Sequence, residues 1–105
     1  MTVQLIVTMT RPGTDIPWHS YTNGKSWYMN DDYYLLNWHD RGRIVSTSVS
    51  VSEDGLTGTF IREFSDWQSL DDFYNDKNLS SCRTLMNTYN DSIGIETINL
   101  EIKEI

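Results

Sequence analysis

The chain has 105 residues, which is enough for one domain and too few for two. Its formal net charge is −7, from 15 acidic and 8 basic residues, and it contains no basic run. An acidic surface repels the phosphates of nucleic acids and does not attract membrane lipids, so neither partner is expected. No apolar run reaches the length of a membrane span, and the first ten residues lack the pattern of a secretory signal.

The composition also bears on compartment and origin. The single cysteine, Cys82, cannot form a disulfide within the chain, which fits a reducing environment. We therefore expect a cytoplasmic protein. The chain has no alanine and eight asparagines, a bias typical of AT-rich genomes such as those of many phages. A viral protein of this kind would act in the host cytoplasm.

The N-terminal part predicts a strand followed by a long connection. Apolar residues alternate with mainly polar ones over Thr2–Thr10, as in a strand. Pro12-Gly13 ends this strand, because proline lacks a backbone donor. The connection then runs to about Lys25 and contains the turn pair Asn23-Gly24.

The first predicted helix covers Ser26–Arg41. Ser26 or Asn30 would cap its N-terminus, and the pair Asp31-Asp32 suits the positive end of a helix dipole. Gly42 predicts the stop, because glycine accepts the left-handed conformation that often ends a helix.

The middle of the chain predicts a β-hairpin. Val or Ile alternates with Ser or Thr over Arg43–Ser52, and a second alternating run covers Leu56–Phe64. Asp54-Gly55 lies between the two runs and suits the positive φ of a tight turn. The two strands are therefore expected to pair antiparallel.

A second helical region follows the hairpin. Ser65 and Gln68 have the spacing of a capping box. Apolar residues recur at helical spacing from Trp67 to Tyr89 and are interrupted at Asn75-Asp76. This pattern predicts either one kinked helix or two helices in series.

The last predicted strand covers Ile95–Ile105, with Ile98 and Leu100 on one face and Thr97 on the other. Residues 1–105 thus form one domain with the order β-α-β-β-α-β, the ferredoxin-like α+β arrangement. This fold has a four-stranded antiparallel sheet with both helices on one face, and right-handed crossovers place the first and third strands in the middle. We expect an uncovered face that is not very polar, and a homodimer formed through it.

Three segments carry a family resemblance: the opening strand VQLIVTMTRPG, the hairpin RIVSTSVSVSEDGLTGTFIREFSD, and the capped helix DWQSLDDFYND with the Ile-rich strand after it. Together they resemble the dimeric α+β barrel superfamily, which includes antibiotic-biosynthesis-type monooxygenases. The resemblance covers most of the chain as an order of elements and includes no diagnostic catalytic motif. It implies two protomers packed sheet to sheet into a barrel, with pockets between each sheet and its helices.

The connection from Arg11 to Tyr21 is the candidate site. It holds both prolines, which fix φ and keep the chain in one path. One interpretation is a structural strap that closes the end of the core. The other is a cleft for a small planar or acidic molecule, rimmed by aromatic, basic and titratable side chains. The residues of this cleft would be Arg11, Trp18, His19, Tyr21, Tyr33, Tyr34, Trp38 and His39.

Other chemical groups give weaker signals. His19 and His39 are the candidates for proton transfer, but no second group can be assigned to work with either. The histidines, Cys82 and the acids show no ligand spacing, so no metal or other cofactor is expected. Cys82 is expected in the core, and Asp71 and Asp72 on a solvated helix face.

Two functions remain open. The first is a non-catalytic homodimeric binding or assembly protein that recognises a small molecule or a protein partner. The second is a cofactor-independent enzyme, monooxygenase-like or isomerase-like, that acts on a small aromatic or acidic molecule. The first is favoured because no group of residues suited to proton transfer can be assembled from the sequence.

Overall fold

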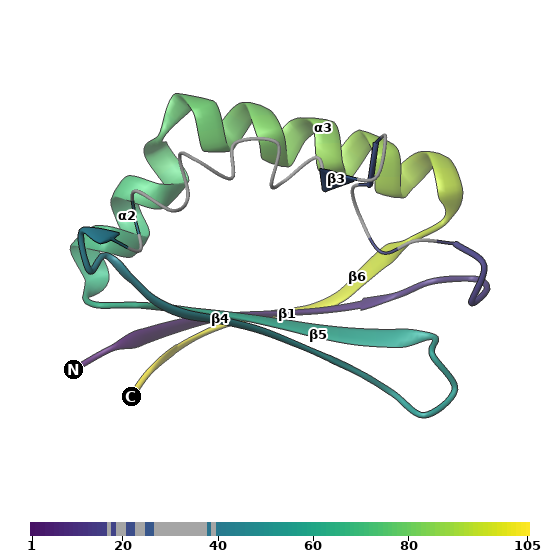
Figure 1. The fold of residues 1–105 in the computed structure, drawn as a ribbon, viewed down its shortest axis with the longest axis horizontal. Helices are drawn as coiled ribbons and strands as arrows, with labels where there is room; N and C mark the ends of the chain where they lie inside the picture. The colour runs from purple at the N-terminus through teal and green to yellow at the C-terminus, as the bar shows by residue number, and fades with distance from the viewer. Residues whose placement is uncertain (17, 19–20, 23–24, 27–37, 39) are drawn as a thin grey trace.

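The computed structural model describes residues 1–16, 18, 21–22, 25–26, 38 and 40–105. Its main layer is a four-stranded antiparallel sheet in the order β4-β5-β1-β6, with α2 and α3 packed on one face (Figure 1). The elements are β1 (Val3–Thr10), β4 (Ile44–Val51), β5 (Thr57–Phe64), α2 (Trp67–Asn75), α3 (Lys77–Ile93) and β6 (Glu96–Glu104). This is the predicted ferredoxin-like fold, and β1 and β5 are the central strands as expected.

The face of the sheet beneath the helices carries the core. Paired residues of antiparallel strands share a face, so the pairing of Val3 with Phe64 places both beneath α2 and α3. Leu5 pairs with Arg62 on the same face. The buried residues of this core are Val3, Leu5, Trp38, Ile44, Phe64, Leu70, Phe73 and Leu79.

The β4–β5 hairpin is confirmed, including its turn. Gly55 has a φ of 75°, in the left-handed region expected for the Asp-Gly pair. The Asp54 carboxylate accepts hydrogen bonds from the Ser52 hydroxyl (2.6 Å) and the Leu56 N–H (3.0 Å). These two bonds, the Ser52 bond first, lower the pKa of Asp54.

The second helical region forms two helices in series, one of the two predicted alternatives. Asp76 has extended backbone (φ −67°, ψ 124°) and separates α2 from α3. Its carboxylate accepts the N–H of Leu79 at 3.1 Å and so caps α3. Neither α2 nor α3 combines the length and the apolar character needed to cross a membrane.

The N-cap of α2 differs from the prediction by one residue. Asp66, not Ser65, accepts the N–H of Ser69, at 2.7 Å. Gln68 does not reach back to the cap; its amide donates to Asp72 instead, at 2.8 Å. A carboxylate makes a stronger, charge-assisted bond to the N–H than a hydroxyl does, which favours the aspartate as cap.

Strand β6 departs from simple alternation at a bulge. Thr8 of β1 pairs with Asn99, but Met9 pairs with Thr97, so Ile98 is an extra residue between them. Thr97 therefore shares the covered face with Met9. The sequence predicted Thr97 on the face opposite to Leu100. This prediction is wrong, because the bulge shifts the alternation of side chains by one residue.

The uncovered face is mainly polar, so the expectation of a less polar face is wrong. Ile6 and Ile61 are cross-strand partners near its centre. The other side chains on this face are Gln4, Thr8, Thr10, Ser46, Ser48, Ser50, Thr57, Thr59, Glu63, Glu96, Asn99, Glu101 and Lys103. The paired apolar residues of the edge strands lie on the covered side, since Val49 pairs with Phe60 and Leu100 with Val7. At the margins of the sheet, Val49 and Leu100 remain 57% and 55% exposed.

Only the end of the first predicted helix lies among the described residues. Trp38 and Asp40 are helical, and Gly42 follows with a φ of 71°. The N–H of Arg43 bonds to the carbonyl of Trp38 at 2.9 Å, which completes the predicted glycine stop.

The connection contains two short strands that the sequence did not predict. β2 (Tyr21–Thr22) pairs antiparallel with β3 (Lys25–Ser26). Ser26 therefore lies in a strand, where the prediction began a helix. The turn pair Asn23-Gly24 and the predicted helix residues from 27 to 37 lie outside the described residues.

Candidate ligand site at the end of the sheet

Three segments of the chain meet where β1 ends. α3 stops here in a glycine-terminated turn, in which Gly94 has a φ of 82° and the Ile95 N–H bonds to the Asn90 carbonyl at 2.9 Å. The connection after β1 passes beside this turn, because a Cβ on Gly94 would lie 3.4 Å from Cγ of Pro12. The turn places the first residues of β6 next to the last turns of α3.

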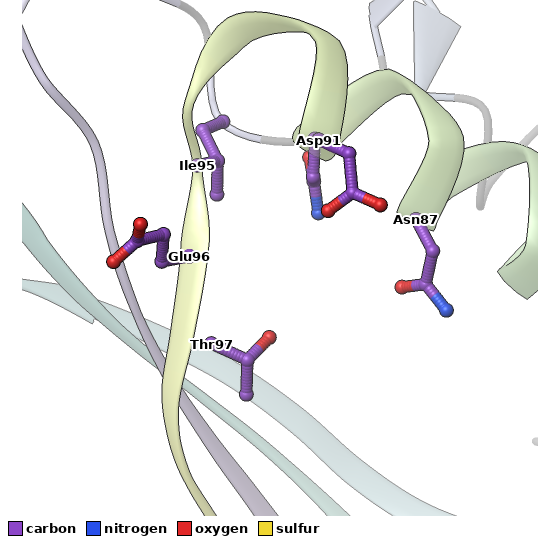
Figure 2. A pocket seen from close by; sticks show the side chains of 6 residues that line it. Asn87, Asp91, Ile95, Glu96 and Thr97 are labelled. Carbon is purple, nitrogen blue, oxygen red and sulfur yellow. The ribbon is translucent and has the colours of Figure 1, made fainter.

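A hollow of about 510 Å³ lies between the end of α3 and the start of β6 (Figure 2). This volume is in the range of small-molecule sites. Asn87 and Asp91 are four residues apart on α3 and share one side of the helix, and Thr97 extends toward the same space from β6 (Figure 2). The lining residues are Asn87, Asn90, Asp91, Ile95, Glu96 and Thr97.

The two carboxylates of the lining do not lie together. Glu96 extends to the other side of β6 from Thr97 (Figure 2), in agreement with its pairing with Thr10 on the uncovered face. Asp91 is therefore the carboxylate on the helix side of the hollow.

Asn90 is the buried polar residue of the lining, with 5% of its surface exposed. Its Nδ2 donates to the sulfur of Met9 at 3.8 Å, a weak hydrogen bond. Its Oδ1 is buried and accepts no hydrogen bond from any described residue. An unsatisfied buried acceptor costs about 1–3 kcal/mol of stability, and this oxygen has almost no accessible surface through which a molecule in the hollow could reach it.

The electrostatics of the hollow favour a positively charged ligand. Asp91 contributes a carboxylate, and the last carbonyl groups of α3 contribute the partial negative charge of a helix C-terminus. The whole chain carries a net charge of −7. No three His, Cys, Asp or Glu side chains of the described residues are grouped as metal ligands.

Arg11 and Trp18, two of the predicted site residues, are brought together beside the hairpin. The Arg11 guanidinium lies 4.6 Å from the Trp18 ring centroid. Trp18 also packs edge-on to Phe60, with centroids 5.9 Å apart. A Cβ on Gly58 would lie 3.2 Å from the Trp18 ring, so the tryptophan covers a central strand rather than the sheet edge.

The hydrogen bonds of Arg11 are those of a strap. Its side chain donates to the carbonyl of Gly55 at 2.7 Å and to the carbonyl of Ile16 at 2.6 Å. Its backbone N–H bonds to the carbonyl of Leu56 at 2.9 Å. Arg11 therefore ties the connection to the hairpin turn, as the structural interpretation requires.

Trp38 lies at the opposite end of the sheet from Trp18. It is 4% exposed and packs edge-on to Phe73, with centroids 5.8 Å apart. Phe64 also packs edge-on to Phe73, and it is six residues along β5 from Gly58, or about 20 Å at the rise of a strand. Trp38 and Trp18 therefore do not rim one cleft.

The remaining predicted site residues cannot be placed. His19, Tyr33, Tyr34 and His39 lie outside the described residues, and Tyr21 is described only as part of β2. The backbone of Cys82 lies in α3, and the core position predicted for its side chain stays a prediction.

Arg43 and Asp72 form an ion pair at the end of the sheet where Trp38 lies. The Arg43 guanidinium lies 4.7 Å from the Trp38 ring centroid and donates to the Asp72 carboxylate. This bond, together with the amide of Gln68, lowers the pKa of Asp72. Asp72 is thus tied to the fold, where the sequence predicted only a solvated position.

Sequence reasoning did not single out Asn90 or Arg62. Asn90 lies in the last turn of α3, and an asparagine near the end of a helix gives no signal of burial in the sequence. Arg62 lies on the covered face with its guanidinium 5.1 Å from the Phe73 ring centroid. Burial, and after it the charge of Arg83, lowers the pKa of Arg62 to about 9. Strand alternation places Arg62 with Phe60 and Phe64, but it does not predict a buried cation.

Solved structures of other proteins share this fold, among them the following three. A conserved protein from Methanosarcina mazei has a TM-score of 0.61 and 15% identity, over 99% of this chain and 92% of that chain. A protein from Deinococcus radiodurans, provisionally assigned as an antibiotic biosynthesis monooxygenase, has a TM-score of 0.52 and 8% identity, over 100% and 92%. A protein from Mycobacterium tuberculosis has a TM-score of 0.50 and 14% identity, over 98% and 91%.

These similarities confirm the predicted resemblance at the level of the fold. The chain has the architecture of the antibiotic-biosynthesis-monooxygenase-like proteins with a ferredoxin-like sheet. No family model and no curated protein matches the sequence. Identities of 8–15% establish a shared fold but not a shared activity.

Proposed function

We propose that this protein is a non-catalytic binding protein that acts as a homodimer. Two copies meet through the uncovered faces of their sheets, and each copy binds a small molecule in the hollow between α3 and β6. The one-sided sheet is the observation that carries the proposal, since both described helices lie on the same face (Figure 1).

The chemistry of the uncovered face supports pairing with a second copy. Its centre is the pair Ile6 and Ile61, surrounded by short hydroxyl side chains. On the central strands, the charged side chain of this face is Glu63, which accepts a hydrogen bond from Gln4 at 3.1 Å. Short side chains allow two sheets to approach to the usual distance of about 10 Å, and an isologous pairing covers the same face on both copies.

Among the described residues, the acidic groups with displaced pKa values belong to the framework of the fold. Strongly perturbed pKa values often mark catalytic groups. Here the pKa values of Asp54, Asp66 and Asp72 are lowered by a turn, a helix cap and an ion pair, respectively. These three carboxylates stabilise the fold.

The dimer is tested by placing a charge near the centre of the uncovered face. Thr59→Glu would place a carboxylate next to Ile61 on the uncovered face, where pairing of two sheets would bury it in both copies, and we expect it to convert the dimer to a monomer in native mass spectrometry and light scattering. Thr88→Glu, the same change on the exposed side of α3, is the matched control and should leave the dimer intact. A wild-type protein that is monomeric at micromolar concentration would refute the homodimer.

The proposal that the protein has no catalytic activity is tested separately by measuring substrate turnover. The enzyme alternative is a cofactor-independent monooxygenase-like or isomerase-like activity on a small aromatic or acidic molecule. Oxygen uptake with a panel of small phenols should stay at the rate of the buffer. Oxygen uptake that depends on the protein and is lost in His19→Ala or His39→Ala would refute the non-catalytic proposal and support the enzyme alternative.

A further inference from the structure

We infer that the outer edge of β4 pairs antiparallel with the same edge of a second copy, so that two sheets join into one continuous sheet. This inference goes beyond the proposed dimer, because the edge lies in the plane of the sheet and the uncovered face lies to one side of that plane. Three features of β4 carry it: backbone groups that point outward, a strand without charged residues, and opposite charges at its two ends.

The backbone of β4 offers hydrogen bonds along its outer edge. Among the described residues, the strand that pairs with β4 is β5, on its other edge. Ser52, directly after β4, donates its N–H to the carbonyl of Thr57 at 2.9 Å and so bonds toward β5. Residues of an antiparallel strand alternate between bonding to the neighbouring strand and pointing away from it. The N–H and C=O groups of Thr47, Val49 and Val51 therefore point outward.

The two edge strands of the sheet differ in charge. Proteins commonly protect edge strands against pairing with charged side chains and bulges. β4, with the sequence IVSTSVSV, has no charged residue, and its bulge between Ile44 and Ser46 leaves the rest of the strand regular. The charged residues of β6 are Glu96, Glu101, Lys103 and Glu104. β4 is therefore the edge that lacks protection by charge.

The side chains of β4 also favour contact with a further strand. Val45, Val49 and Val51 are 51%, 57% and 47% exposed, and serine or threonine occupies the positions between them. An added strand would bury part of this apolar surface while its backbone bonds to the outward groups, as in the recognition of a strand by a sheet edge.

Charges at the ends of β4 point to a second copy as the added strand. Arg41 and Arg43 precede β4, and Glu53 and Asp54 follow it. Arg43 keeps 22% of its side chain exposed beside its ion pair with Asp72. Antiparallel pairing of two copies brings the basic start of each strand to the acidic end of the other, so opposite charges meet twice. An uncharged strand between these ends lets two copies of a chain with a net charge of −7 approach without facing like charges.

The same charges give the register. Ser48 lies midway between Arg43 and Glu53 in the sequence, so a two-fold axis at Ser48 brings Arg43 of each copy toward Glu53 of the other. This axis sets Thr47 of one copy opposite Val49 of the other, and their outward backbone groups then exchange hydrogen bonds. The contact is isologous, so it uses the β4 edges of both copies.

The test is sedimentation velocity of the full chain from micromolar to millimolar concentration. Species larger than the face-to-face dimer should appear as the concentration rises, because a single pair of edge strands is a small interface. Hydrogen exchange should then slow at the amides of Thr47, Val49 and Val51 and stay unchanged along β6. The association should weaken at high salt, because charge attraction is screened.

Val49→Lys adds to β4 the kind of charge that protects an edge, at a side chain that is already exposed. Its pair with Thr47 occurs twice across the axis, so we expect the association constant to fall by about tenfold. Leu100→Lys is the matched control, because Leu100 is equally exposed on the other edge strand. It should associate as the wild type does, and both variants should keep the wild-type melting temperature.

Glu53→Lys tests the charges without changing the strand, since Glu53 is exposed in the turn. It makes the net charge of the chain less negative, which by itself would favour association. We expect it nevertheless to weaken the edge contact, because it places like charges at both ends of β4.

Three results would overturn the inference. They are no association beyond the face-to-face dimer up to millimolar concentration, association that Val49→Lys leaves unchanged, and slowed exchange along β6 in place of β4. Thr59→Glu should remove the association seen at micromolar concentration and keep the edge contact, whereas Val49→Lys should do the reverse. The edge contact and the proposed dimer therefore fail independently.

Discussion

The two ends of the covered face of the sheet differ in what they bury. Where β1 begins, Phe73 packs edge-on to Trp38 and Phe64, and Arg43 links this aromatic cluster to Asp72. Where β1 ends, the buried contact is between Asn90 and Met9, next to an open hollow. The aromatic end gains stability from packing, while the polar end gives up stability at one unsatisfied acceptor. The two ends should therefore respond differently to substitution.

The largest effect is expected from Phe73→Ala at the aromatic end. Phe73 is fully buried, and its removal leaves a cavity among Trp38, Phe64 and Leu70. The free energy of unfolding should fall by about 3–5 kcal/mol in a urea titration. Trp18→Ala at the other end should cost clearly less, because Trp18 is only partly buried. Equal losses would remove the distinction between the two ends.

A smaller loss is expected from Gly55→Val in the hairpin turn beside the strap. Gly55 has a φ of 75°, and a Cβ there would lie 3.0 Å from Cγ2 of Thr14. A β-branched residue in this conformation should cost about 1–3 kcal/mol. Gly55→Asn is the matched variant, since asparagine tolerates positive φ, and should lose less. Equal melting temperatures for wild type and Gly55→Val would contradict the turn geometry.

Asn90→Leu should have an effect of opposite sign at the polar end. Replacing a buried, unsatisfied amide by an apolar side chain of similar size should raise the free energy of unfolding by about 1 kcal/mol. A variant that is strongly destabilised would show that the amide has a structural role, and the comparison between the two ends would fail.

The smallest effect on the free energy of unfolding is expected from a change of pH, and several carboxylates contribute to it. Asp54, Asp66 and Asp72 have pKa values lowered below the usual 3.8 by their hydrogen bonds. Their stabilisation is complete above about pH 3.8 and is lost as the pH falls through the lower pKa values of the folded state. The free energy of unfolding, measured by urea titration from pH 7 to pH 2.5, should therefore fall in the acid range. Asp72→Asn should flatten this slope, and Asp71→Asn should not.

Much of the fold could be predicted because its signals are local. The alternation in β4 and β5 and the Asp-Gly turn define the hairpin, and the break at Asp76 divides the helical region as the sequence indicates. The predictions that failed concern positions where neighbouring groups compete for the same role. Asp66 displaced Ser65 as helix cap because the carboxylate is the better acceptor, and the bulge at Ile98 moved Thr97 to the covered face.

By itself, the sequence determined the order of the elements, the central position of β1 and β5, and the resemblance in fold, because periodicity and turn residues act within a few positions of the chain. Only the tertiary structure decided which face of each edge strand meets the helices, since an edge strand carries the same alternation whichever side is covered. It alone separated Trp18 from Trp38 and enclosed Asn90 beside Met9. These contacts join residues as much as 81 positions apart in the chain, and no local pattern of residues encodes such a distance.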